Sequence, residues 1–175
     1  MREKRIRASA GTKRGPRAAR RKTTNPSPAK APARNAVPSA PPFSTGIEHI
    51  GIAVKDCDKA ATSMRTILGA RVLETIVSQE RGLKLAFLDV SGTRVELLEP
   101  LTKDGTVAKF LETKGEGFHH IAFKVRDIQK TLSLLRQAGV KLVEPAPQKG
   151  AHGNLLAFIH PSSACGVLVE LCERK

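Results

Sequence analysis

The 175-residue chain has no Trp, no Tyr and six Phe residues, and it has only three Cys residues. A cleft that binds drugs by stacking would be expected to offer more aromatic rings, and so would a surface that stacks on nucleic-acid bases. The cysteines, Cys57, Cys165 and Cys172, are odd in number and lack metal-ligand spacing, which argues against a disulfide framework or a zinc knuckle. We therefore expect three small, buried or half-buried thiols. No apolar run approaches the roughly 20 residues of a membrane-spanning helix, so we expect a cytoplasmic protein without a membrane partner.

Positive charge is concentrated at the start of the chain. The formal net charge is +14, and residues 1–45 contain 12 Lys or Arg against the single acid Glu3. This segment is rich in Ala, Pro and Ser and cannot bury enough apolar surface to offset its ordering entropy. We predict that residues 1–45 form a disordered basic Ala/Pro/Arg-rich tail and that residues 46–175 fold as one domain.

The tail has competing interpretations. An Arg-rich start with few acids is typical of an organellar transit peptide, which would direct the protein to the mitochondrial matrix, but the apolar face of such a peptide is nearly absent. Unspecific contact with nucleic acid is a weaker alternative, because no aromatic residues accompany the charges. The tail could also be a dispensable extension, or reflect a start codon assigned too far upstream.

The rest of the chain contains an internal repeat. The sequence at 47–56 recurs 71 positions later at 118–127, and that at 95–99 recurs 74 positions later at 169–173. Each copy carries one His near its start and one Glu near its end: His49 and Glu96, then His120 and Glu170. Two imidazoles and two carboxylates suit one octahedral divalent metal with positions left for a substrate. The repeat therefore predicts a shared metal site.

The opening of each copy has the pattern of a strand followed by a helix. His49, Gly51 and Ala53 alternate with Ile50 and branched neighbours, so the His face of the strand is lined by small residues and a hollow is expected above it. A helix should follow, with Asp56 or Asp58 as N-cap, an apolar stripe of Ala60 or Ala61, Met64 and Ile67 or Leu68, and Gly69 as terminator. In the second copy the same roles fall to Asp127, to the stripe Ile128, Leu132, Leu135 and Ala138, and to Gly139.

Three strand-like runs follow each helix. They cover 71–77, 83–90 and 93–98 in the first copy and 141–144, 155–160 and 167–172 in the second. We predict an α+β fold of two tandem βαβββ modules, at about 46–100 and 117–173, joined by a helix at about 104–114. The modules should form a curved mixed sheet with a cleft on one face and helices on the outer face. Residues 148–153 are expected to form a flexible glycine turn.

These modules and several phrases resemble the vicinal oxygen chelate superfamily, which includes the glyoxalases, bleomycin-resistance proteins and dioxygenases. Within it, the chain is similar to the methylmalonyl-CoA epimerases. The phrases that carry the resemblance are Glu48-His49-Ile50-Gly51-Ile52-Ala53-Val54, Gly117-Phe118-His119-His120-Ile121-Ala122, Gly150-Ala151-His152-Gly153 and Gly166-Val167-Leu168-Val169-Glu170-Leu171.

The resemblance implies metal ligands at His49, Glu96, His120 and Glu170, and a divalent ion such as Co, Mn, Ni, Zn or Mg. It implies epimerisation of methylmalonyl-CoA at C2 by 1,1-proton transfer through a metal-stabilised enolate. The expected partners are an acyl-CoA thioester and a second copy of the chain. Glu170 is the candidate catalytic residue for one face of C2. The sequence departs from part of the family at Leu85, where some epimerases carry a Glu, so no group is assigned to the other face.

Three alternatives stay open. Glyoxalase I uses the same ligand types and also moves a proton next to a carbonyl. An extradiol dioxygenase would want two His and one carboxylate on Fe(II), which Glu96 as a fourth ligand disfavours. A non-enzymatic small-molecule-binding protein of the same fold is the third. Of the remaining histidines, we expect His119 to point away from His120 as a packing residue and His160 to cap a turn, while His152 either contacts substrate or is solvated.

Overall fold

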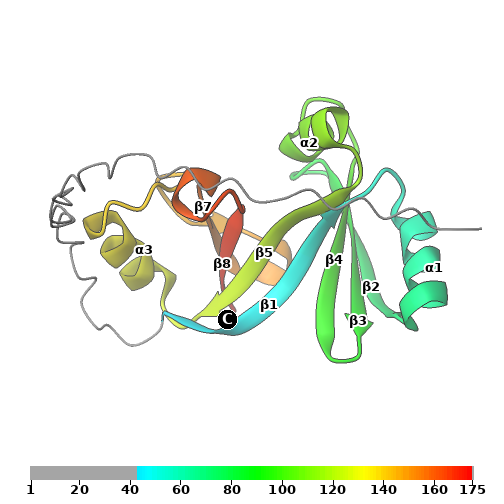
Figure 1. Ribbon diagram of the computed structural model, residues 1–175, viewed down its shortest axis with the longest axis horizontal. Coiled ribbons are helices and arrows are strands. Elements are labelled where there is room, and N and C mark those ends of the chain that lie inside the picture. Colours follow the sequence, from blue (N-terminus) through cyan, green and yellow to red (C-terminus); the bar gives the residue numbers. More distant parts are fainter. Residues whose placement is uncertain (1–42, 175) are drawn as a thin grey trace, which may run out of the picture. The chain divides into compact units, whose positions relative to one another are not determined.

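The computed structural model describes residues 43–174, so nearly all of the predicted tail at 1–45 lies outside the described residues. Within 43–174, the elements follow the order strand, helix, three strands, and this order occurs twice (Figure 1). Module one contains β1 (Ser44–Ala53), α1 (Cys57–Leu68), β2 (Arg71–Ser78), β3 (Leu83–Val90) and β4 (Thr93–Pro100). The linking helix is α2 (Thr106–Lys114). Module two contains β5 (Gly117–Val125), α3 (Ile128–Gln137), β6 (Gln148–Lys149), β7 (Leu155–Ile159) and β8 (Val169–Glu173).

All eight strands of the described residues form a single mixed sheet in the order β2-β3-β4-β1-β5-β8-β7-β6. The first strands of the two modules, β1 and β5, pair antiparallel at its centre. Each is flanked by the last strand of its own module in parallel, β4 beside β1 and β8 beside β5. The modules thus pair within one chain, and the predicted fold class is confirmed.

In module one, α1 packs on the outer face of the sheet. Asp56 caps the helix, since its carboxylate accepts hydrogen bonds of 3.0 Å from the backbone N–H groups of Asp58 and Lys59. Gly69 ends it with a φ of 67°, as predicted. The apolar stripe is shorter than predicted. Ile67 and Leu68 are 73% and 51% exposed, because the last turn of α1 extends past the core formed with residues such as Leu88 and Leu97.

Module two has the same order of elements, but the segment between α3 and β7 contains less regular structure than predicted. Asp127 caps α3, and Ile128, Leu132 and Leu135 pack against the sheet. The predicted strand at 141–144 is wrong: only Leu142 forms a bridge, to Ile159. Pro145 and Pro147 follow, and proline has no N–H for a ladder. The strand on the outer side of β7 is instead the short β6, inside the segment expected to be a flexible turn. A 3₁₀ turn at Ala151–Gly153 follows it.

The structure also bears on the expectations for the three cysteines and for membrane-spanning helices. Cys57 and Cys172 are buried as predicted, whereas Cys165, in the turn before β8, is exposed, contrary to the prediction. None of the helices within 43–174 has the length and apolar character that a bilayer crossing would need.

Candidate metal centre

One His and one Glu from each module meet on the inner face, the sheet face opposite α1 and α3. Glu96 lies on β4 beside Gly51 of β1, and Glu170 lies on β8 beside Ala122 of β5. The Nε2 atoms of His49 and His120 are 2.9 Å apart. Glu96 Oε2 lies 3.2 Å from His49 Nε2 and 3.6 Å from His120 Nε2. Glu170 Oε2 lies 3.5 Å from His120 Nε2, and its Oε1 lies 4.0 Å from His49 Nε2.

These spacings suit the coordination shell of one ion. Nitrogen and oxygen ligands sit about 2.1 Å from a first-row divalent metal, so adjacent octahedral ligands are about 3 Å apart and opposite ligands about 4 Å. Donor atoms of His49, Glu96 and His120 all lie within 4.8 Å of one another, and these residues are buried. Glu170 contacts the cluster through both histidines. The four predicted residues could therefore hold a metal together.

A matching irregularity in each module orients the two imidazoles. In the β1–β5 ladder, Glu48 and His119 are the residues skipped by two register shifts, so each bulges beside the His that follows it. Glu48 Oε2 lies 2.5 Å from His49 Nδ1, and His119 Nδ1 lies 2.9 Å from His120 Nδ1. With both Nδ1 atoms engaged, both Nε2 atoms remain for the shared centre.

The same bulge overturns one prediction. Strict strand alternation would send His119 and His120 to opposite faces, but their side chains are in contact. His119 also packs edge-on against Phe110 of α2, with ring centroids 4.9 Å apart. The packing role predicted for His119 is therefore present, although its direction is reversed.

Gly51 makes room for the His120 ring. A Cβ built on Gly51 would lie only 2.2 Å from His120 Cε1 and 2.3 Å from His120 Nδ1. Gly51 faces His120 across the β1–β5 ladder, so any side chain there would displace the imidazole. The hollow predicted from the small residues beside His49 is thus filled by the partner histidine.

Comparisons with known proteins agree with this architecture. Residues 48–158 match the family model of the Glyoxalase/Bleomycin resistance protein/Dioxygenase superfamily. The chain belongs to this superfamily. It is 41% identical over 129 residues to the uncharacterized protein YqjC of Bacillus subtilis, covering 74% of this chain and 92% of that protein. It is 38% identical over 126 residues to human mitochondrial methylmalonyl-CoA epimerase, covering 71% and 72%.

A solved structure extends the comparison. A variant of Streptomyces coelicolor methylmalonyl-CoA epimerase in complex with 2-nitronate-propionyl-CoA superposes with a TM-score of 0.69 at 38% identity, covering 74% of this chain and 97% of that one. The predicted resemblance is confirmed for both the superfamily and its epimerase subgroup.

In this superfamily member, burial and mutual contacts strongly perturb the pKa values of His49, His120 and Glu170. Burial opposes a charge on His49, but its hydrogen bonds to Glu48 and Glu96 and the carboxylate charges raise the pKa of His49 to about 10. Burial and the charges of His49 and His119 hold the pKa of His120 well below its ordinary value. Burial raises the pKa of Glu170 to about 8. Positive charge on His49 is thus favoured where the carboxylates of Glu96 and Glu170 converge.

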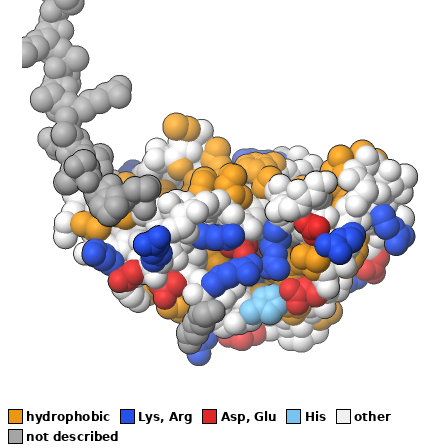
Figure 2. Space-filling view, turned by 90° about the horizontal axis from the view of Figure 1, so that it is seen from below, with side chains coloured by type: hydrophobic (Ala, Val, Ile, Leu, Met, Phe, Trp, Pro, Cys, Tyr) orange, Lys and Arg blue, Asp and Glu red, His pale blue; other side chains and the backbone are white. Residues whose placement is uncertain are grey.

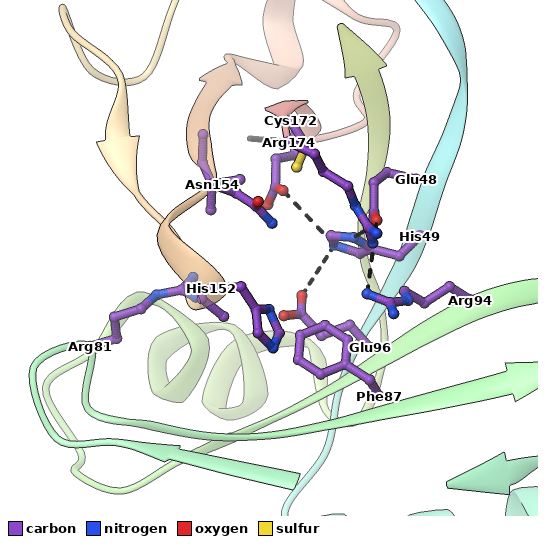
Figure 3. Close-up of a pocket in the computed structure, with 13 residues that line it drawn as sticks. Glu48, His49, Arg81, Phe87, Arg94, Glu96, His152, Asn154, Cys172 and Arg174 are labelled. Carbon is purple, nitrogen blue, oxygen red and sulfur yellow. Dashed lines mark hydrogen bonds and ion pairs between the residues drawn. The ribbon is translucent and has the colours of Figure 1, made fainter. Parts of the chain in front are cut away.

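The centre opens into a pocket on the inner face. Figure 3 shows His49 and Glu96 pointing into it, with Phe87 and His152 on one side and Arg94 and Arg174 on another. Arg174 bonds to Glu48 Oε1, and Arg94 Nη1 lies 3.9 Å from the same atom. Burial opposes a charge on Glu48, but the hydrogen bond and charge of His49, together with Arg174, lower the pKa of Glu48 to about 2.

An adjoining pocket is predominantly basic. It shares Glu48, Arg94 and Arg174 with the metal-centre pocket and adds Arg71 and Lys124, while Asp89 also lines it. Lys and Arg side chains form a band across the face of the molecule seen in Figure 2. An anionic ligand that reaches the centre by this side would meet favourable potential.

The structure adds functional candidates that the sequence prediction missed. Glu48, Arg94 and Arg174 were not assigned a role. Only Glu48 had a usable signal, because the 71-residue offset of the repeat aligns it with His119. Leu85 of β3 is fully buried in an apolar cluster. As the sequence indicates, it supplies no acid to the inner face. His160 caps the 3₁₀ turn at Pro161–Ser163 through the N–H of Ser162, which confirms its predicted role.

Proposed function

We propose that this protein epimerises methylmalonyl-CoA at C2. The observation that carries the proposal is the convergence of His49, Glu96, His120 and Glu170, two from each module, beside a pocket that all of them except His120 line. The 38% identity to human methylmalonyl-CoA epimerase and the likeness to a relative bound to an acyl-CoA analogue indicate the substrate class.

The donor set supports a resident divalent cation. Glu170 Oε1 is buried and has no hydrogen-bond partner, which would be costly unless something positive pairs with it. The two Nε2 atoms face each other at 2.9 Å, while each Nδ1 is already engaged. We propose His49, Glu96, His120 and Glu170 as its ligands. When bound, such an ion supplies a Lewis acid that favours negative charge on the thioester carbonyl oxygen.

Glu170 is proposed to move a proton at one face of C2. Its carboxylate has two oxygens, so one can serve a cation while the other accepts or returns the C2 proton. At 2% exposure, the carboxylate is shielded from water, so a proton transfer at this position would take place away from bulk solvent.

The basic pocket is proposed to hold the nucleotide end of the thioester. Arg71, Arg94, Lys124 and Arg174 line it beside the centre. The phosphates of coenzyme A are anionic, so these side chains would attract them and orient the acyl group toward Glu170. A homodimer and a cytoplasmic location, with the mitochondrial matrix as the alternative, stay predictions.

Solvent exchange tests the proposal directly. The full-length protein with a divalent metal and either epimer of methylmalonyl-CoA in deuterated water should incorporate deuterium at C2 and interconvert the epimers. Methylglyoxal with glutathione, offered in parallel, should not be turned over. Absence of exchange, with turnover of the glutathione adduct, would instead establish glyoxalase I activity. Binding of the thioester without any exchange would indicate a non-enzymatic binding protein.

A further inference from the structure

A loop of module two crosses the inner face and contacts module one. This loop, residues 150–154, carries His152, whose Nε2 lies 3.0 Å from Glu74 Oε2 on β2. The His152 ring also packs on Phe87 of β3, with centroids 5.8 Å apart. Glu74 and Phe87 are paired across the β2–β3 ladder, so both present their side chains to the same face. His152 is thus held by two residues of the other module.

The loop backbone holds His152 in a conformation that L residues rarely adopt. His152 has a φ of 62°, in the left-handed region. The N–H of Gly150 donates to the carbonyl of Asn154 at 2.9 Å, which closes the loop. A Cβ on Gly150 would lie 2.5 Å from Leu156 Cδ1, so the loop also packs tightly on β7. Strain of this kind persists where the surrounding structure enforces it, and it is concentrated at functional sites.

The loop reaches a wall of the pocket that β3 supplies with apolar side chains. Ala151, next to His152, packs against the cluster that contains Leu85 and Phe87. Leu85 and Phe87 are two residues apart on β3, so their side chains share a face. Figure 3 shows His152 in the same pocket as Glu96, beside Phe87. An imidazole therefore stands at a wall where this face of β3 offers only the apolar side chains of Leu83, Leu85 and Phe87.

We propose that His152 is the second proton-transfer group, acting on the face of C2 opposite Glu170, with Glu74 as its positioning residue. This inference rests on the proposed epimerase function. Among the described ionisable side chains of the pocket, His152 is outside the metal-ligand set and can both accept and donate a proton. Its side chain is 41% exposed, which allows the proton exchange with solvent that resets the site.

The proton balance closes in each direction. Neutral His152 takes the C2 proton of one epimer, and the electron pair of the C–H bond moves toward the thioester carbonyl. The carboxyl group of Glu170 then gives its proton to C2 from the other face, and the carbonyl bond re-forms. The reverse direction begins at the carboxylate of Glu170 and ends at the imidazolium of His152. Glu74 accepts a hydrogen bond from the imidazole and so orients the ring.

The test is His152→Asn in the full chain. Asn tolerates the left-handed backbone but cannot transfer a proton, and the variant should keep its metal, because no proposed ligand is changed. Interconversion should fall roughly 10²–10⁴-fold, the usual contribution of a positioned acid or base. Deuterium should still wash into C2 of the one epimer whose proton faces Glu170. His160→Asn, at an exposed capping histidine, is the matched control and should remain fully active.

Further variants separate proton transfer from packing. His152→Gly removes the ring and suits a φ of 62°, so added imidazole should restore part of the lost rate. Glu74→Ala removes the acceptor that orients the ring, so kcat for interconversion should fall with little change in KM, and Glu74→Gln, which keeps an acceptor oxygen, should restore much of the rate.

The outcomes distinguish this inference from the proposed function. A wild-type protein without exchange would refute the epimerase itself. An active wild type whose His152→Asn variant interconverts the epimers at the normal rate would refute the role of His152 alone. Loss of exchange from both epimers, with metal content and fold intact, would also refute it, because a group serving one face cannot stop exchange at the other.

Discussion

Gly51→Ala offers a test of the metal centre that changes no ligand. The added Cβ would lie 2.2 Å from His120 Cε1 and 2.7 Å from His120 Nε2. An ordinary carbon contact needs about 3.5 Å or more, so the ring must retreat by about 1 Å. Metal–ligand distances tolerate only about 0.2 Å, so the retreat should remove His120 from the shared point. We expect overpacking to lower the free energy of unfolding by about 1–3 kcal/mol and activity to fall by about 10²-fold or more.

Three measurements on one preparation check this expectation. Elemental analysis should find the bound metal greatly reduced, denaturant unfolding should report the stability loss, and the deuterium-exchange assay should report activity. Gly105→Ala is the matched control, because nothing lies within 4 Å of a Cβ at Gly105. It should change stability by less than about 1 kcal/mol and leave the metal in place. Full metal content and activity in Gly51→Ala would refute the inferred geometry of His120.

The remaining predictions concern the metal and its protons. His120→Ala should abolish metal retention, as judged by elemental analysis, whereas retention of a full equivalent would mean that the site is elsewhere. Glu48→Gln weakens the partner of His49 Nδ1 and should lower metal affinity by about 10–100-fold in calorimetric titrations. Because the pKa of His49 is raised to about 10 in the metal-free protein, this ring holds a proton at pH 7 and must release it to bind a cation. Metal affinity should therefore rise with pH, and calorimetry in buffers of different ionisation enthalpy should show proton release. A strong chelator should abolish exchange and lower the melting temperature, and divalent metal should restore both.

Much of this protein could be predicted from local patterns. The 71-residue repeat identified His49 and His120, and the carboxylates inside apolar strands identified Glu96 and Glu170, because burying a charge in a strand is costly without a partner. Caps such as Asp56 and Asp127 act within a few residues of themselves, so the starts of α1 and α3 were readable directly.

Bulges and contacts between distant residues could not be predicted from local sequence patterns. Strict strand alternation placed His119 and His120 on opposite faces of the sheet. That prediction was wrong because His119 has no partner in the β1–β5 ladder, and such a bulge interrupts the alternation of side-chain directions. The predicted strand at 141–144 failed for a related reason: pairing depends on which backbone groups find partners, and the ladder there reduces to one bridge at Leu142. His152 was left between substrate contact and solvation, since its contact with Glu74 spans 78 positions.

The sequence by itself determined that two similar modules each carry an imidazole and a carboxylate, because duplication leaves the same chemistry at a constant offset. Only the tertiary structure decided that the modules pair through β1 and β5, which brings the two Nε2 atoms to 2.9 Å. It also decided that Glu48 and His119 orient those rings and that a loop of one module reaches the wall of the other. Such contacts depend on which distant strands pair and where their register shifts, and a local sequence pattern does not specify the position of a bulge.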